Sequence, residues 1–202
     1  MKKYIIIISL MLAMSNLSCS VYDTLVNISR VKFKLGKVDN FSLNGIQISN
    51  KQKLSDFSTM DILNFSSAVL QGKLPVSFML NVEAKNPNDG TGGYKSTGAT
   101  LKSFPWRLLI DNKEAISGNI ASAVSVPGTG ETTIIKLQMN VDLIQLFKNQ
   151  GYESLVNLAL NIGGRGGSSS KLTLFAKPVV STVIGDLSYP GELKIVDYEF
   201  SN

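Results

Sequence analysis

From Val76 to Ala84 an apolar residue stands at every second position, and the residues between and after them are Ser77, Met79, Asn81, Glu83 and Lys85. A period of two is that of a β-strand with one face buried and the other in water, whereas a helix would scatter these apolar residues around its axis. Pro75 precedes the alternation, and the turn-forming run Asn86-Pro87-Asn88-Asp89-Gly90 follows it. The sequence therefore predicts a strand here. Its inward face is predicted to comprise Val76, Phe78, Leu80, Val82 and Ala84.

The same alternation recurs along most of the chain in short runs separated by turn-forming residues. A change of phase at Gly45 is interpreted as a β-bulge. Alternation with one polar face is typical of sheets that pack on one side only, so antiparallel sheets are expected. Several short strands spaced by turns favour an all-β sandwich. The runs lie at residues 31–35, 41–48, 106–110, 135–141, 172–176 and 193–200.

One segment breaks this rhythm and has helical spacing. Asp142 is placed as an N-cap before the apolar residues Leu143, Leu146 and Phe147. A second apolar set resumes at Leu155 about a quarter-turn out of phase, so two short helices are predicted, the first stopped at Gly151. The following residues, Gly163 to Ser170, are interpreted as a flexible connector.

The inventory of reactive side chains excludes several kinds of site. The chain has no histidine and one cysteine, Cys19. Serine–histidine and cysteine–histidine catalysis, the usual zinc sites and an internal disulfide are therefore excluded. Without Lys2 and Lys3 of the leader, the 20 basic residues fall to 18 against 15 acidic ones. Such a small excess does not indicate a nucleic-acid partner.

The first residues are typical of a secretory signal peptide. Lys2 and Lys3 precede a short apolar run that ends in small and polar residues before Cys19. Because that run has about ten residues, against the roughly 20 of a spanning helix, a retained membrane anchor is the weaker alternative. The predicted organisation is a signal peptide at 1–18, a lipidated cysteine and tether at 19–30, and one domain at 31–202.

The segment Leu17-Ser18-Cys19-Ser20 resembles the lipobox of bacterial lipoproteins, although Asn16 stands where leucine is usual. The resemblance implies that Cys19 is acylated and becomes the mature N-terminus. The alternative is a secreted protein with an incidental leader cysteine. Membrane attachment is then expected through the acyl chains. The lack of an acidic stretch after Cys19 favours the periplasmic face of the envelope, and we expect the outer membrane.

An ordered set of short motifs resembles the late-embryogenesis-abundant type 2 (LEA type 2) family, also called the WHy domain family. The set comprises Leu74-Pro75-Val76, Val82 to Asn88, Tyr94, Ile116 to Gly118, and Pro127-Gly128. The resemblance covers about residues 31–200. It implies an antiparallel fibronectin-like β-sandwich of about seven strands with one short helical segment. Members of this family are regarded as non-enzymatic, and some are linked to water stress or to membranes.

Each candidate site also has a simpler structural interpretation. Oxygens of Asn86, Asn88 and Asp89 could bind Ca²⁺, but no spaced acidic series follows, so a turn is favoured. Residues 163–171 lack the ending of a phosphate-binding loop and are interpreted as a linker. Trp106 could stack against a ligand but is assigned to the core. We predict no catalytic residue, no metal and no cofactor, and leave any ligand-binding residues unknown. The remaining charged candidates are interpreted as surface residues: Glu83, Lys85, Asp111, Glu114 and Glu131.

Three functions remain open from the sequence. The first is a non-enzymatic envelope lipoprotein that acts as a structural, stress-protective or protein-binding module. The second is a periplasmic carrier or sensor of an apolar ligand such as a lipid, which a deep apolar cavity between the sheets would favour. The third is an enzyme that uses carboxylates or tyrosine, which charged residues converging in a cleft would favour.

Overall fold

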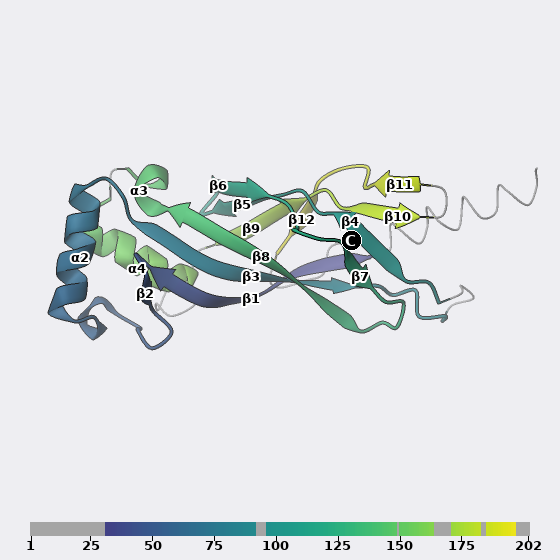
Figure 1. The fold of residues 1–202 in the computed structure, drawn as a ribbon, viewed down its shortest axis with the longest axis horizontal. Helices are drawn as coiled ribbons and strands as arrows, with labels where there is room; N and C mark the ends of the chain where they lie inside the picture. Colours follow the sequence, from purple (N-terminus) through teal and green to yellow (C-terminus); the bar gives the residue numbers. More distant parts are fainter. Residues whose placement is uncertain (1–30, 92–95, 149, 164–170, 183–184, 197–202) are drawn as a thin grey trace, which may run out of the picture.

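A computed structural model of the chain describes residues 31–91, 96–148, 150–163, 171–182 and 185–196. Cys19, the leader and the tether lie outside these ranges, as do residues 164–170 of the predicted connector. In the described residues all strand pairings are antiparallel, and the all-β prediction is confirmed. The long strands run lengthwise, and the helices gather at one end (Figure 1).

The first layer is one sheet with strand order β2-β1-β3-β8. It is formed by β1 (Lys32–Leu43), β2 (Ile46–Gln47), β3 (Pro75–Lys85) and β8 (Thr132–Asp142). β3 lies in the middle, and its Val82 pairs with Leu35 on one side and Ile135 on the other. The five residues predicted to point inward from β3 are all buried, so the predicted register is confirmed.

The second layer consists of two four-stranded sheets, with orders β12-β9-β5-β6 and β11-β10-β4-β7. Each strand of one sheet continues along the chain into a strand of the other. Three of the four junctions contain a proline, namely Pro105, Pro178 and Pro190. Proline has no N–H to donate to a ladder, so the strands break at these places. The four pairs are β4 (Ala99–Ser103) with β5 (Trp106–Ile110), β6 (Lys113–Gly118) with β7 (Val124–Val126), β9 (Leu172–Ala176) with β10 (Val179–Thr182), and β11 (Gly185–Ser188) with β12 (Leu193–Ile195).

Backbone hydrogen bonds tie the two halves together at the break. The Lys177 amide donates to the Pro105 carbonyl over 2.9 Å, and the Tyr189 amide donates to the Pro178 carbonyl over 3.0 Å. Counted as continuous runs, the second layer has four strands. Together with β1, β3 and β8 they give the predicted seven, with β2 as a short addition.

Large side chains fill the space between the two layers. Phe33 of β1 meets Phe104, at the break of the second layer, with ring centroids 5.2 Å apart. Phe41 and Phe78 stack at 5.2 Å within the first layer. Both layers contribute fully buried aliphatic residues, among them Leu80 and Leu108. The core therefore extends along the sandwich as one cluster.

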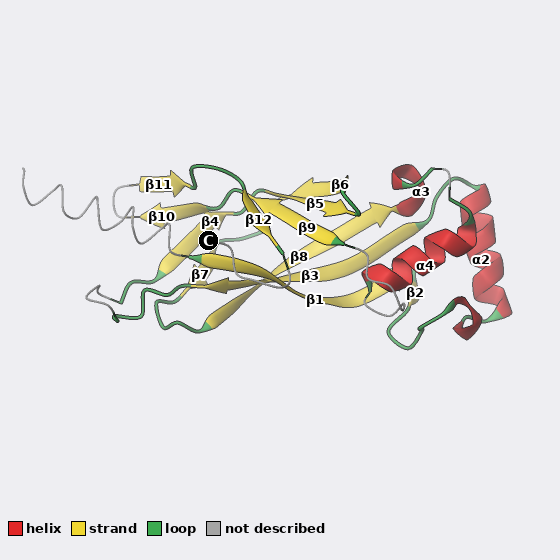
Figure 2. Cartoon of the chain, turned by 180° about the vertical axis from the view of Figure 1, so that it is seen from behind, coloured by secondary structure: helices red, strands yellow, loops and turns green. Residues whose placement is uncertain are grey.

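The predicted helical segment is present as α3 (Leu143–Leu146) and α4 (Tyr152–Ile162) (Figure 2). The Asp142 carboxylate caps α3 by accepting from the Ile144 amide over 3.0 Å, as predicted. The predicted stop at Gly151 is wrong in detail. The first helix ends earlier, at Leu146, and Gly151 is instead the N-cap of the second.

A helix that the sequence analysis did not predict caps the same end of the sandwich. The chain leaves β2, forms a short 3-10 turn (η1, Leu54–Asp56) and then α2 (Thr59–Leu70). A capping box starts α2: the Ser58 hydroxyl accepts from the Asp61 amide, and the Asp61 carboxylate accepts from the Ser58 amide. The expectation of a single helical segment is therefore wrong, because α2 forms a second one.

The interpretation of Gly45 as a β-bulge is also wrong. Asn44 and Gly45 form the tight turn between β1 and β2, with φ values of 47° and 81°. Two consecutive positive φ values are those of a hairpin turn, which the dipeptide Asn-Gly favours. The irregularities of β1 lie before this turn, between Leu35 and Val38 and between Asp39 and Ser42.

Candidate functional site

The turn after β3 is a buried clasp in which the Asn86 side chain ties three segments together. Its Nδ2 donates to the carbonyl of Thr97 over 2.8 Å and to that of Val126 over 3.2 Å. Its Oδ1 accepts from the backbone amide of Asn88 over 3.1 Å and from the side-chain amide of Asn88 over 2.8 Å. Because both atoms of the Asn86 amide are used inside the protein, the interpretation as a turn stands and a ligand role for Asn86 is disfavoured.

Gly128 closes this clasp from the other side. A Cβ at Gly128 would lie 2.5 Å from the Asn88 carbonyl oxygen and 2.6 Å from that of Thr97. Both atoms belong to the backbone, so only glycine fits here without moving the chain. Asp89 is exposed, and its carboxylate accepts from the amide and hydroxyl of Thr91. The motif that carried the family resemblance therefore has a structural role in this chain.

Trp106 lies in the core, as predicted, with its ring packed against Gly118 of the neighbouring strand. A Cβ at Gly118 would approach the ring to 2.6 Å, which explains the glycine at that position. The indole Nε1 is buried, with no hydrogen-bond partner among the described residues.

The charged candidates lie on the surface, as predicted. Glu83 of β3 pairs with Lys34 of β1 at 3.2 Å. Glu114 is 3.4 Å from Arg107, and exposed Asp111 accepts from the Lys171 amide. Lys85 and Glu131 are exposed. In the described ranges, no three acidic or cysteine side chains come together as a metal site would need. That the chain binds no metal remains a prediction.

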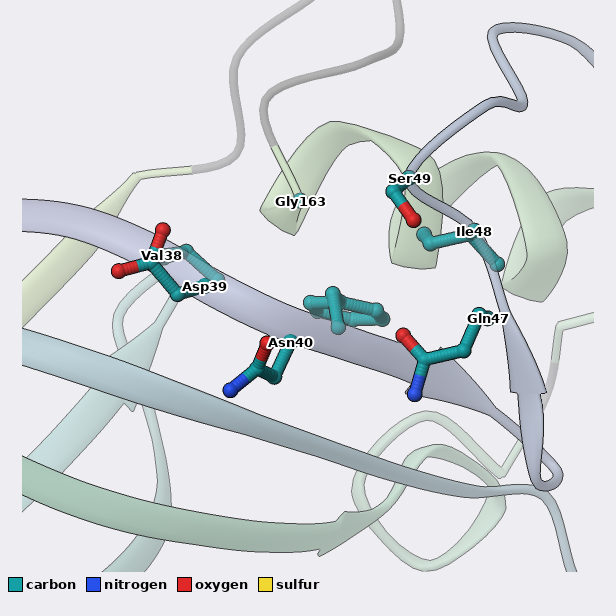
Figure 3. A pocket seen from close by; sticks show the side chains of 8 residues that line it. Val38, Asp39, Asn40, Gln47, Ile48, Ser49 and Gly163 are labelled. Atoms are coloured by element: carbon teal, nitrogen blue, oxygen red, sulfur yellow. The ribbon is translucent and has the colours of Figure 1, made fainter.

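Figure 3 shows a hollow between β1 and the segment after β2, bordered by the end of α4. Its volume is about 310 Å³. Buried Phe41 and Ile48 contribute apolar surface, whereas Asp39 and Asn40 on one side and Gln47 and Ser49 on the other are exposed. Asp39 is the only ionisable residue among those lining it and accepts from the Asn81 amide over 2.6 Å. The described lining thus offers no acid–base pair.

A second hollow of about 360 Å³ lies near the helical end of the first sheet. Ser42, Ser77 and Asn140 lie side by side across β1, β3 and β8. The two hydroxyls bond to each other over 2.7 Å. Asp142 at its end already accepts from the amides of Leu74 and Ile144. The hollow therefore presents neutral hydroxyl and amide groups.

The clearest surface feature is on α2, which the sequence analysis left unassigned. Met60, Leu63 and Leu70 are 65%, 59% and 89% exposed. Among the described residues, the only other exposed large apolar side chain is Ile134. Exposed apolar residues gathered on one element mark an interaction surface more often than scattered ones do. The capping-box pair Ser58 and Asp61 was the sequence signal that could have revealed this helix.

Tyr189 ties the start of β1 to the break in the second layer. Its hydroxyl donates to the Val31 carbonyl over 3.0 Å, and its ring meets Phe33 at 6.4 Å. Burial raises the pKa of the Tyr189 hydroxyl well above its ordinary value of 10.0. The folded state therefore holds this proton more tightly than the unfolded state does.

This linkage predicts a loss of stability in alkali. Below pH 10 the proton is bound in both states, and above it the unfolded tyrosine ionises while the folded one does not. The stability advantage of the wild type over Tyr189→Phe should therefore shrink as the pH rises above 10, in urea unfolding at several pH values. A constant difference would show that the hydroxyl is not desolvated.

Comparisons with known proteins add little. No family model matches the sequence, and no curated protein matches it. Among solved structures, a protein from Archaeoglobus fulgidus is similar at 10% sequence identity and a TM-score of 0.34. The match covers 59% of this chain and 82% of that one. A TM-score at this level carries no inference about function.

No helix among the described residues has the length and apolar character needed to cross a bilayer.

Proposed function

We propose that this chain is a non-enzymatic lipoprotein of the cell envelope, anchored through acyl chains on Cys19, whose LEA type 2-like sandwich serves as a protein-binding module. The single observation that carries the proposal is the contrast between a filled interior and an apolar surface on α2. Phe33, Phe104 and Phe78 occupy the space where a carrier would keep a cavity. The exposed apolar surface lies on the outside, where a partner protein would reach it.

The charged groups also favour a module over an enzyme. Some described carboxylates, such as Asp61 and Glu192, have lowered pKa values. Hydrogen bonds from nearby groups at the surface cause this lowering. Such shifts are typical of helix caps and exposed ion pairs. The groups with shifted pKa values do not line either hollow.

Thermal melts with candidate ligands test the proposal against the carrier. A ligand that binds only the native state adds about 2.7 kcal/mol of stability at a hundredfold excess over its Kd. We expect no shift in Tm for the full chain with a panel of fatty acids and phospholipids, with millimolar Ca²⁺, or with EDTA.

A rise of several degrees with lipids alone would contradict the proposal and support the carrier. A rise with Ca²⁺ that Asp89→Ala abolishes would show that the turn after β3 binds a metal. The Gln138→Ala variant, altered at an exposed amide of β8 that lines neither hollow, is the control.

A further inference from the structure

Helix α2 lies across the helical end of the sandwich with one side packed inward and one side in solvent (Figures 1 and 2). On the inner side Phe65 is fully buried and meets Phe57 edge-on at 5.1 Å. The outer side carries Met60, Leu63, Ser67 and Leu70, all exposed. We call these four residues the α2 outer face.

The α2 outer face lacks the charges that a water-facing helix normally carries. Asp61 is the only charged residue of α2, and its carboxylate is bound to the Ser58 amide at the start of the helix. The other exposed positions of the helix, Thr59 and Asn64, are uncharged. Burial of this face therefore desolvates no charge.

The spacing of the α2 outer face fits another helix. Met60, Leu63, Ser67 and Leu70 follow one another at intervals of three, four and three residues, the spacing of the apolar seam in a coiled coil. In an antiparallel pair of such seams, Leu63 lies across from Ser67 and Met60 across from Leu70. A large residue then meets a small one at the centre of the seam, as packing of knobs into holes requires.

Repulsion between like charges and the helix dipoles favour one direction of pairing. Lys73 is exposed just past the C-terminal end, and Asp56 and Asp61 lie at the N-terminal end. Lys51 and Lys53 share that N-terminal end, where Lys51 is held over the Phe57 ring at 5.4 Å. Parallel helices would bring two Lys73 side chains together, whereas antiparallel helices place each Lys73 at the other copy's N-terminal end, where two lysines and two aspartates balance, and also oppose the helix dipoles.

We propose that the α2 outer face pairs antiparallel with the same face of a second copy of this chain. The contact is isologous, so it closes at two copies. A 12-residue helix is about 18 Å long. The surface area that two such helices bury against each other is therefore smaller than the roughly 1,200–2,000 Å² buried in stable interfaces. The pair is therefore weak in solution and forms where copies are concentrated. That last step rests on the proposed function, because the acyl anchor would supply the concentration.

Cysteine cross-linking in cells that export the full chain tests this pairing. Two differently tagged copies, one with Leu63→Cys and one with Ser67→Cys, are expressed together and treated with a short bismaleimide. Both positions are exposed, so the fold should be undisturbed, which an unchanged Tm verifies. Copies with Gln138→Cys, an exposed position on β8, give the background.

The mixed pair should cross-link at least tenfold more than the Gln138→Cys background and clearly more than either same-site pair. Cross-linking at background level overturns the proposal. Dominant Leu63→Cys homodimers overturn the antiparallel direction and with it the proposed pairing. A cross-link chiefly to a different protein, or protection of Leu63→Cys from water-soluble maleimide by lipid alone, overturns the second copy as occupant.

Acylation of Cys19 is read by mass in the same samples, which separates the two proposals. Acylated chains without cross-links leave the lipoprotein standing and remove the dimer. Cross-links between chains that are not acylated do the reverse.

Discussion

Replacing Val82 by aspartate is expected to destabilise the protein by roughly 4–5 kcal/mol, a large share of the typical 5–15 kcal/mol of a domain. Val82 is fully buried at the centre of the first sheet, between Leu35 and Ile135. The nearest lysines of the neighbouring strands, Lys34 and Lys136, pair in register with Glu83 and Asn81 on the opposite face of the sheet, so a carboxylate at position 82 points away from them. Urea unfolding of wild type and variant measures the difference through the shift of the midpoint at constant slope.

The control for this substitution follows from the structure. Asn81, the neighbour that points to the opposite face, donates its amide to Asp39, so Asn81→Asp would set two carboxylates side by side. Gln138→Asp on β8 is the better match, because Gln138 is exposed. We expect it to cost less than about 1 kcal/mol. Equal losses from the two variants would contradict the burial of Val82 in the core.

Removing the Asn86 side chain is expected to cost about 3 kcal/mol. Asn86→Ala leaves the Thr97 and Val126 carbonyls and the Asn88 amide without the partner they have in the clasp. Each buried polar group left unsatisfied costs about 1–3 kcal/mol. The measurement is again urea unfolding.

Asn140→Ala removes an exposed amide from β8 and should change the free energy of unfolding by no more than about 0.5 kcal/mol. If Asn86→Ala were as mild as Asn140→Ala, the clasp would not stabilise the fold. A loss of Ca²⁺ affinity without a loss of stability would instead indicate the ligand role that the structure disfavours.

The strands could be predicted from the sequence because half-buried strands record their environment in a period of two. β3 shows this best, since its alternation was enough to assign the burial of Val76 to Ala84 correctly. The breaks in the second layer were not predicted from the sequence. Pro105 and Pro178 were visible as residues that cannot donate to a ladder, but their alignment at one level depends on long-range pairing.

Helix α2 escaped prediction because its apolar residues are not confined to one side. Phe65 faces inward while Leu63 and Leu70 face outward, so the segment has no clear helical stripe. The pair Ser58 and Asp61 was the available signal, as a capping box. The clasp was predicted only as a turn, because the partners of Asn86 lie 11 and 40 residues away in the sequence.

The proposed function begins with the anchor on Cys19, and the mass of the mature N-terminus tests it most directly. The full chain is produced with its own leader in cells fed an alkyne fatty acid, alongside Cys19→Ser. We predict that the wild type starts at Cys19, carries acyl chains there and is labelled, whereas Cys19→Ser is neither labelled nor retained on membranes. A mature N-terminus downstream of Cys19, or equal labelling of both chains, would contradict the lipoprotein account.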